Sequence, residues 1–407
     1  MINAAPALTR RAVLWLGQTC NLRCYFCYFL DRIENAHHPE HAFMSLGKAK
    51  EICLTLRKFY KCDAIDIQGG EPTIYPQILE LIVYCRSIGL APTLITNGIY
   101  LAQPGRLEEF KKAGIADFLC SLHGIGKVHD EVVGRDGAYE KLICAIEKMN
   151  ELEIPVRINC TLTKPVIAIL PQIAKKAIEL KVLVVNFIAF NPFDDQKSGK
   201  RSALNVASYS EIKPKLSEAL DLLEAAGIEA NVRYLPLCFA EERHRKNFYN
   251  LQQLSYDPHE WDYQSWQWTG QQPQRMSDGP LSPTHRLGFN DRHFMYRSLE
   301  LRDWVSHNPL WAKSLMKIQH ALAMVNQIIF GKKNLYRKEA NDRAKLDLGY
   351  KYHLDCQKCS LRKICDGFHG DYAEIFGLAE AAPVLQSSLV DDPVFFVRNQ
   401  NKLASRI

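Results

Sequence analysis

Short apolar runs alternate with longer segments of helical periodicity between residues 10 and about 235. The apolar runs have the length of buried strands, and the segments between them repeat apolar residues every three or four positions. Strands are expected at 12–16, 64–68, 92–96, 118–121, 156–161, 182–190 and 229–234, and helices at 45–58, 75–88, 106–113, 138–152, 168–180 and 208–226. Repeated strand–helix units predict an α/β fold with a parallel sheet. Because the units continue in one direction, a partial (βα)6 TIM-like barrel is favoured over a doubly wound sheet.

The pattern changes after this region and divides the chain into three parts. Residues 10–235 are predicted to form the barrel, 236–345 an irregular insert that faces a substrate, and 346–407 a C-terminal α+β region. The insert contains a run of aromatic residues, namely Tyr256, Trp261, Tyr263, Trp266 and Trp268. These would pack inside the insert or, alternatively, form a lid. Residues 310–330 are too polar to span a membrane, so we expect a core or interface helix, with a membrane-surface or partner-binding face as the alternative.

Composition and charge exclude several classes of protein. Of the 407 residues, 47% are hydrophobic and 24% are charged, as in ordinary globular proteins. The formal net charge of +6 is spread along the chain without a basic block, which disfavours a nucleic-acid partner. The first residues lack the charged start and apolar core of a signal peptide. With no transmembrane segment predicted either, the 13 cysteines indicate metal ligation in a reducing, cytoplasmic compartment rather than disulfides.

Three cysteines lie close together just after the first predicted strand. Cys20, Cys24 and Cys27 have the spacing C-x3-C-x2-C. Three thiolates on one short loop can bind three irons of a [4Fe–4S] cluster and leave the fourth iron open to a substrate or cofactor. The alternatives are a zinc loop, although zinc knuckles usually pair C-x2-C units with four ligands, and three neighbouring thiols without a metal. The loop follows the C-terminal end of a strand, where α/β barrels place their chemistry.

Polar residues also follow the next predicted strands. The second strand ends in Gly69-Gly70-Glu71, where two glycines would allow the backbone to approach a ligand closely and the carboxylate could bind an ammonium group. The polar residues at or after later strands are Thr96, Asn97, Ser121, Arg135 and Asn159. Each of them could instead cap a helix or stabilise a turn.

The cysteine loop and the Gly-Gly-Glu strand end together resemble the radical S-adenosylmethionine (SAM) superfamily. The resemblance covers roughly the first 200 residues and also favours a partial barrel. It implies a [4Fe–4S] cluster on the three cysteines, whose open iron is chelated by the amino and carboxylate groups of SAM. The strand end at Gly69-Gly70-Glu71 would receive the amino group, and Phe26 would lie beside the adenine. Reductive cleavage of SAM would then give a 5′-deoxyadenosyl radical that abstracts hydrogen from a substrate.

Residues 120–137 resemble the S-L-D-G…H-D…R-G stretch of peptide-modifying radical SAM enzymes. There the serine and the arginine help to hold the SAM carboxylate, so the resemblance implies this role for Ser121 and Arg135. Asn159 would contact the methionine or ribose end, and Thr96 and Asn97 complete the expected pocket. The chain departs from the pattern because His123 replaces the usual aspartate and Gly134-Arg135 inverts the common order.

A second cysteine group, Cys356, Cys359 and Cys365, has the spacing C-x2-C-x5-C. It resembles the SPASM and twitch extensions of radical SAM enzymes, which bind auxiliary [4Fe–4S] clusters. The SPASM pattern ends in a fourth cysteine at the position that His369 occupies here. We expect Cys238 to be the fourth ligand, with His369 as a neighbouring donor or a rare ligand. The alternatives are structural zinc at this group and a buried free thiol at Cys238.

These resemblances imply an oxygen-sensitive enzyme, an oxidoreductase or isomerase, that receives electrons from a flavodoxin- or ferredoxin-type reductant. A sugar- or nucleotide-like small molecule is the expected substrate, because no leader-peptide recognition domain is evident before residue 10. One alternative is a SPASM-type maturase that oxidises or cross-links a peptide or protein. The other is an iron–sulfur electron-transfer protein without catalysis. The pattern identifies no residue that acts directly on the substrate.

Overall fold

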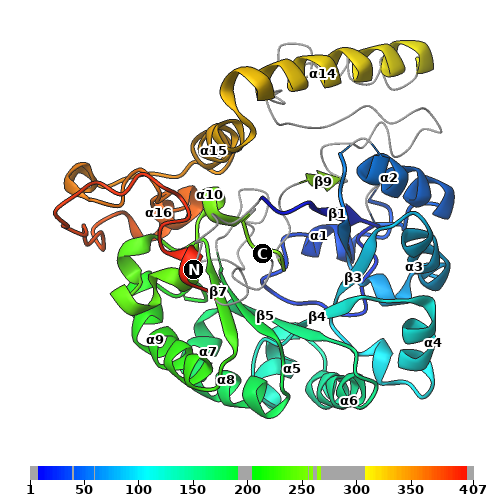
Figure 1. The fold of residues 1–407 in the computed structure, drawn as a ribbon. Coiled ribbons are helices and arrows are strands. Elements are labelled where there is room, and N and C mark those ends of the chain that lie inside the picture. The colour runs from blue at the N-terminus through cyan, green and yellow to red at the C-terminus, as the bar shows by residue number, and fades with distance from the viewer. Residues whose placement is uncertain are drawn as a thin grey trace.

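A computed structural model describes residues 8–38, 41–58, 60–190, 204–254, 256–259, 264–266 and 308–400. Its central feature is one curled sheet in the order β8-β7-β6-β5-β4-β3-β2-β1-β9 (Figure 1). The strands are β1 (Arg11–Trp15), β2 (Ala64–Gln68), β3 (Ala91–Thr96), β4 (Asp117–Ser121), β5 (Val156–Leu162), β6 (Val184–Ala189), β7 (Glu229–Arg233), β8 (Phe248–Tyr249) and β9 (Gln264–Trp266). All eight neighbouring pairs among them are parallel. The predicted partial barrel is thus confirmed, with β8 and β9 as additional strands.

Helices cover the outer face of the curled sheet (Figure 1). The helices up to residue 254 are α1 (Leu30–Glu34), α2 (Leu46–Lys58), α3 (Ile78–Ser87), α4 (Arg106–Ala113), α5 (Lys127–Val133), α6 (Ala138–Glu151), α7 (Lys164–Ile167), α8 (Leu170–Glu179), α9 (Tyr209–Ala225) and α10 (Leu251–Leu254). The six helices expected from periodicity coincide with α2, α3, α4, α6, α8 and α9. The start of α9 carries a reciprocal cap, because Ser208 accepts from the backbone N–H of Glu211 while Glu211 accepts from that of Ser208.

Side chains alternate along β5 between the convex face of the sheet, which the helices cover, and the concave face inside the barrel. Ile158 and Cys160 are fully buried on the side that the helices cover, because the strand period of two sends every second side chain outward. Arg157 and Asn159 point to the other side, into the barrel. The sheet therefore has an apolar core on its convex face and polar residues on its concave face.

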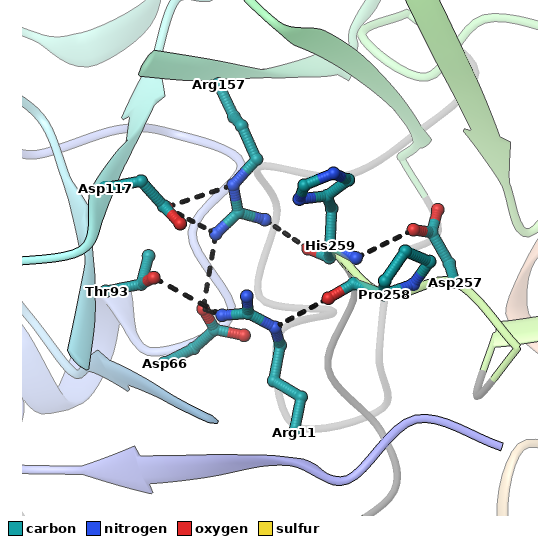
Figure 2. A network of polar contacts seen from close by, with 8 residues as sticks. All are labelled: Arg11, Asp66, Thr93, Asp117, Arg157, Asp257, Pro258 and His259. Carbon is teal, nitrogen blue, oxygen red and sulfur yellow. Dashed lines mark hydrogen bonds and ion pairs between the residues drawn. The ribbon is translucent and has the colours of Figure 1, made fainter. Parts of the chain in front are cut away.

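A network of buried charges lies on this concave face, near the starts of β1, β4 and β5 (Figure 2). Arg157 is fully buried and donates to Asp117 Oδ1 from Nε at 3.1 Å and from Nη2 at 2.8 Å. Arg11 donates to Asp66 Oδ1 at 2.8 Å and to Thr93 Oγ1 at 3.3 Å. Burial opposes ionisation of Asp117, but the charges of Arg157 and Arg11 outweigh it and hold the pKa of that carboxyl below its ordinary value. Burial instead raises the pKa of Asp66 despite the two arginines.

The segment 257–259 is tied to this network by its backbone. Arg11 Nε donates to the carbonyl of Pro258 at 3.2 Å, and Arg157 Nη1 donates to the carbonyl of His259 (Figure 2). The backbone N–H of His259 donates to Asp257 Oδ1 at 2.8 Å. The chain that follows β8 therefore contacts this buried network before it reaches β9.

Two long helices follow, α14 (Pro309–Phe330) and α15 (Lys332–Asp342), and α14 projects from the body of the molecule (Figure 1). No helix among the described residues combines the length and apolarity needed to cross a membrane. Of the aromatic residues noted in the insert, Tyr256 is buried with its ring 6.5 Å from that of Tyr336. Trp261, Tyr263 and Trp268 lie outside the described residues.

The C-terminal part consists of short turns, an antiparallel bridge between Lys351 and Phe368, and α16 (Gly370–Phe376). It packs on the barrel through Tyr372, whose ring is stacked on that of Tyr209 with the centroids 3.6 Å apart. The Tyr372 hydroxyl accepts from the backbone N–H of Tyr209 at 2.8 Å. A stacked pair of buried tyrosines thus joins the start of α9 to the C-terminal part.

Candidate active site

The loop with Cys20, Cys24 and Cys27 starts at the C-terminal edge of the sheet, and all three thiols are partly buried. Burial raises the pKa of Cys20 to about 12, and the negative charges of Glu71 and Cys27 add to the effect. Burial also raises the pKa of Cys24, followed by the charges of Cys27 and Cys20. The three thiols are therefore close enough to oppose each other's ionisation, and positively charged iron would offset this.

The two glycines at the end of β2 bring this strand against the chain that leads into the cysteine loop. Gly70 N–H donates to the carbonyl of Gly17 at 2.7 Å, and Glu71 N–H to that of Thr19 at 2.9 Å. A Cβ on Gly69 would lie 2.3 Å from Gly17 O, and one on Gly70 would lie 2.1 Å from Thr19 O. The sequence suggested glycines for close approach to a ligand. The structure shows a close approach of the backbone to itself, which positions the cysteine loop.

The carboxylate of Glu71 lies inside the protein, 1% exposed, and accepts four hydrogen bonds. Oε1 accepts from Thr73 N at 3.0 Å, Thr73 Oγ1 at 2.6 Å and Thr96 Oγ1 at 2.7 Å, while Oε2 accepts from Asn97 N at 2.8 Å. Burial raises its pKa, and these hydrogen bonds counteract the rise. Glu71 and Thr96 therefore fix the ends of β2 and β3 to each other.

Asn97 and Arg135 also contact the cysteine loop. Asn97 Nδ2 donates to Asn21 Oδ1 at 2.7 Å, and Arg135 Nη1 donates to the carbonyl of Asn21 at 3.1 Å. On the same side, the N–H of Arg23 donates to the carbonyl of Val133 at 3.1 Å. Two of the residues expected to contact SAM thus hold the loop between its first two cysteines, and Asn21 is a contact that the motif did not predict.

Phe26 extends from the cysteine loop toward the end of β4. Its ring centroid lies 4.7 Å from that of His123, with the planes at 71°. His123 Nδ1 accepts from the N–H of Thr161 at 3.1 Å, so this network assigns the imidazole proton to Nε2. Burial lowers the pKa of His123 to about 3, and the imidazole is therefore neutral. The sequence showed His123 only as a departure from a pattern, and its ring contact with Phe26 could not be predicted from it.

Ser121 and Asn159 are register partners on β4 and β5. Asn159 Oδ1 is buried and accepts no hydrogen bond from the described part of the protein. A buried acceptor of this kind usually has a partner, and a ligand hydroxyl or amino group would supply one. The two residues therefore lie together at the edge where the cysteine loop begins.

The second cysteine group surrounds a pocket between the barrel and the C-terminal part. Cys238, Cys356, Cys359 and Cys365 all line it. Cys365 Sγ accepts from the N–H of Leu237 at 3.5 Å and from that of Gly367 at 3.4 Å. Burial raises the pKa of Cys238, and the charges of Cys356 and Cys359 contribute. The fold thus brings Cys238 to three cysteines that follow more than a hundred residues later in the chain.

His369 has a different role in the structure. Its Nδ1 accepts from the N–H of Asp371 at 3.3 Å, so that it caps the start of α16. Its ring packs against Tyr350 at 5.1 Å between centroids, and burial lowers its pKa to about 4. Among the described residues, no three His, Cys, Asp or Glu side chains are arranged around a single metal ion. A cubane cluster does not require such an arrangement, because each thiolate binds a different iron.

Comparison with known proteins agrees with this geometry in the barrel. Residues 16–177 match the model of the radical SAM superfamily, and this part of the chain is a radical SAM superfamily domain. Such a domain implies an iron–sulfur cluster and SAM as cofactors. The matched segment contains the cysteine loop, the Gly-Gly-Glu strand end and the β4–β5 pair described above.

The chain is similar to several curated enzymes. It is 30% identical over 156 residues to AdoMet-dependent heme synthase of Methanosarcina barkeri (38% of this chain, 43% of the relative). It is 27% identical over 224 residues to a probable GTP 3′,8-cyclase of Sulfurisphaera tokodaii (54% of this chain, 67% of the relative). It is 29% identical over 172 residues to PqqA peptide cyclase of Bradyrhizobium diazoefficiens (41% of this chain, 43% of the relative). The chain spans less than half the length of the first of these relatives. Among solved structures, SuiB of Streptococcus suis bound to SAM has a TM-score of 0.46 at 21% identity, covering 55% of this chain and 50% of that one.

Proposed function

We propose that the chain is a radical SAM enzyme that holds two [4Fe–4S] clusters, one for SAM cleavage and one auxiliary. The observation that carries the proposal is the grouping of seven cysteines into two sets, three on the loop beside β2 and four around one pocket. When bound at the first set, the cluster and SAM would supply the electron and the sulfonium whose reductive cleavage gives a 5′-deoxyadenosyl radical. That radical would remove a hydrogen atom from the substrate.

The residues of the first site divide into those that position the loop and those that are available to SAM. Glu71 and Thr96 bind each other inside the protein and hold the strand ends in place. The backbone at Gly69-Gly70-Glu71 would then receive the amino group of SAM. Asn159, whose Oδ1 has an open acceptor position, would accept from a hydroxyl of the ribose. Ser121, beside Asn159 in register, would contact the carboxylate end.

Phe26 and His123 would close the site around the adenine. Phe26 offers an aromatic surface, and the neutral His123 beside it excludes water without placing a positive charge near the sulfonium. Arg135 and Asn97 would act through the loop, because both contact Asn21.

The auxiliary cluster would be bound by Cys238, Cys356, Cys359 and Cys365, which give the four thiolates that a fully protein-ligated cluster requires. His369 caps α16 instead of lining this pocket, which supports Cys238 as the fourth ligand. We retain the division into a barrel (10–235), an insert (236–345) and an auxiliary-cluster region (346–407) as a proposal, in which the insert also adds β8 and β9 to the barrel sheet.

Within the expected class of sugar- or nucleotide-like small molecules, we propose a nucleotide-like substrate. The similarity to a probable GTP 3′,8-cyclase supports it, since it extends over 54% of this chain and 67% of that relative. The similarity to PqqA peptide cyclase supports a peptide as the second candidate. A flavodoxin- or ferredoxin-type protein would supply the electron, and the cytoplasm is the proposed location.

Anaerobic reconstitution followed by iron and sulfide counting tests the two-cluster proposal. About eight irons and eight sulfides per chain are expected. Cys24→Ala and Cys238→Ala should each lower the count to about four. His369→Asn, which keeps a cap on α16, and Cys144→Ala, at an exposed cysteine outside both groups, should leave it unchanged. Zinc without sulfide would refute the proposal, and eight irons in Cys238→Ala would refute the fourth ligand.

Incubation with SAM and dithionite then tests catalysis. The wild-type protein and Cys238→Ala should form 5′-deoxyadenosine, whereas Cys24→Ala should form none. Two clusters without 5′-deoxyadenosine in the wild-type protein would indicate an electron-transfer protein instead. Deuterated nucleotides and deuterated peptides, added separately, distinguish the two substrate classes by the deuterium that appears in 5′-deoxyadenosine.

A further inference from the structure

Helix α14 exposes its apolar face. Ile318, Leu322, Val325 and Ile329 recur at spacings of four, three and four, so they share one stripe of the helix. Their exposed fractions are 55%, 45%, 49% and 65%. A helix on the surface of a globular protein normally turns such a stripe toward the core. In α14 the stripe is exposed, as are the apolar Met324, Ile328 and Phe330 outside it. The helix projects from the body of the molecule (Figure 1).

The charge around this stripe has a single sign. Residues 309–338, which cover α14 and the first part of α15, contain five lysines and one arginine but no aspartate or glutamate. Three of the lysines, Lys332, Lys333 and Lys338, lie on α15, which continues after α14 with Glu339 and Asp342 as its acidic residues. An apolar stripe with basic neighbours is the pattern of helices that lie in the surface of an anionic bilayer.

We propose that α14 docks on a lipid bilayer surface that contains anionic headgroups. The apolar stripe would enter the boundary between headgroups and acyl chains, and the lysines would meet the lipid charges. At 1.5 Å per residue, the 22 residues of the helix would lie along about 33 Å of the surface. A second copy of this chain fits the surface less well, because two copies would bring together two 309–338 segments that each carry only basic charges.

Docking of α14 would position the whole barrel, because α15 connects it firmly to the body. Tyr336 Oη donates to the carbonyl of Leu251 on α10 at 3.2 Å. Arg337 Nη2 donates to Asp391 Oδ1 at 2.7 Å, and Arg337 Nε donates to Gln252 Oε1 at 3.0 Å. A membrane-bound α14 would therefore hold the catalytic domain at the bilayer. This inference goes beyond the proposed function and does not depend on either cluster.

Sedimentation of the reconstituted full-length protein with vesicles tests the inference. Vesicles of phosphatidylcholine with about 30% phosphatidylglycerol should bind the protein roughly tenfold more tightly than phosphatidylcholine alone. The triple substitution Ile318→Ser, Val325→Ser and Ile329→Ser should weaken this binding at least about tenfold. Lys333→Glu with Lys338→Glu should remove much of the preference for anionic lipid, and raising the salt concentration should weaken binding.

Substitution of two exposed apolar residues elsewhere, Val83→Ser and Leu183→Ser, is the matched control and should leave vesicle binding unchanged. SAM cleavage and melting temperature of the triple variant should equal those of the wild-type protein. Absence of binding to either vesicle would overturn the inference. A wild-type dimer that the triple substitution dissociates would assign the face to a second copy, and a lower melting temperature would assign it to another segment of the chain.

Discussion

Substitution of Arg157 by methionine tests how much the buried charges contribute to the barrel. Methionine retains much of the side-chain volume but removes the cation that Asp117 contacts through two hydrogen bonds and Asp66 through one at 3.4 Å. Removal of one partner from a buried ion pair leaves an uncompensated charge and costs about 3–5 kcal/mol. At roughly 2–4 °C per kcal/mol, the melting temperature should fall by at least about 6 °C.

Arg10 on the surface provides the control. Arg10 Nη2 lies 3.1 Å from Asp63 Oδ2, but the two side chains are 52% and 48% exposed. Arg10→Met should therefore change the free energy of unfolding by less than about 1 kcal/mol. Thermal unfolding followed by circular dichroism compares the two variants. An Arg157→Met melting temperature as high as that of Arg10→Met would refute the reasoning.

The pH dependence gives a second test of the same substitution. In the wild-type protein the pKa of Asp117 is lower when folded than when unfolded. Its ionised form thus stabilises the fold above the ordinary carboxyl pKa of about 4, and this stabilisation is lost as the pH falls through the folded pKa. Without Arg157, most of this stabilisation by ionised Asp117 is absent. The difference in melting temperature between wild type and Arg157→Met should therefore be largest near neutral pH and should shrink as the pH falls below about 4.

Three further predictions concern the residues around the cysteine loop and the pocket. Gly70→Ala should displace the cysteine loop and lower the iron bound by the first cysteine set, because its Cβ would lie 2.1 Å from Thr19 O. Gly47→Ala, whose Cβ would have nothing within 4 Å, is the control: it should leave the bound iron unchanged, and in thermal unfolding it should be neutral or stabilising by about 0.5–1 kcal/mol. Glu71→Gln should lower the free energy of unfolding in urea by about 1–3 kcal/mol, because the side-chain amide nitrogen cannot accept hydrogen bonds from the donors that surround both carboxylate oxygens. Glu80→Gln, at an exposed position, is the control and should change the free energy of unfolding little. Asn159→Leu should weaken SAM binding measured by calorimetry without lowering the melting temperature, and unchanged SAM affinity would contradict a ligand role for its unpaired Oδ1.

Much of the barrel could be predicted from the sequence, since each long strand carries a clear apolar run and each helix an apolar stripe. The second strand was predicted at its observed bounds, Ala64–Gln68, and the fourth helix of the barrel at Arg106–Ala113. The strands β8 and β9 were missed because two or three residues are too few to show a period. They exist because neighbouring strands offer pairing partners.

The site was only partly predictable, because motifs identify residues and not the atoms that they contact. The cysteine spacing predicted the loop, but nothing local indicated that Glu71 would be bound by Thr96 and Asn97 from another strand. The proposal of Cys238 rather than His369 as the fourth ligand likewise rests on tertiary structure. His369 stands at the position of a fourth cysteine in the sequence, yet its Nδ1 caps a helix, while the distant Cys238 lines the pocket.

The pairing of β9 with β1 has a consequence for synthesis of the chain. β1 is made before its partner β9, and this strand, which covers one edge of β1, follows about 250 residues later. At ribosomal rates of roughly 5–20 residues per second, this edge stays without its partner for about 12–50 s. Unpaired strand edges are templates for association with other chains. The nascent barrel therefore passes through an interval in which this edge of β1 is open to pairing with other chains.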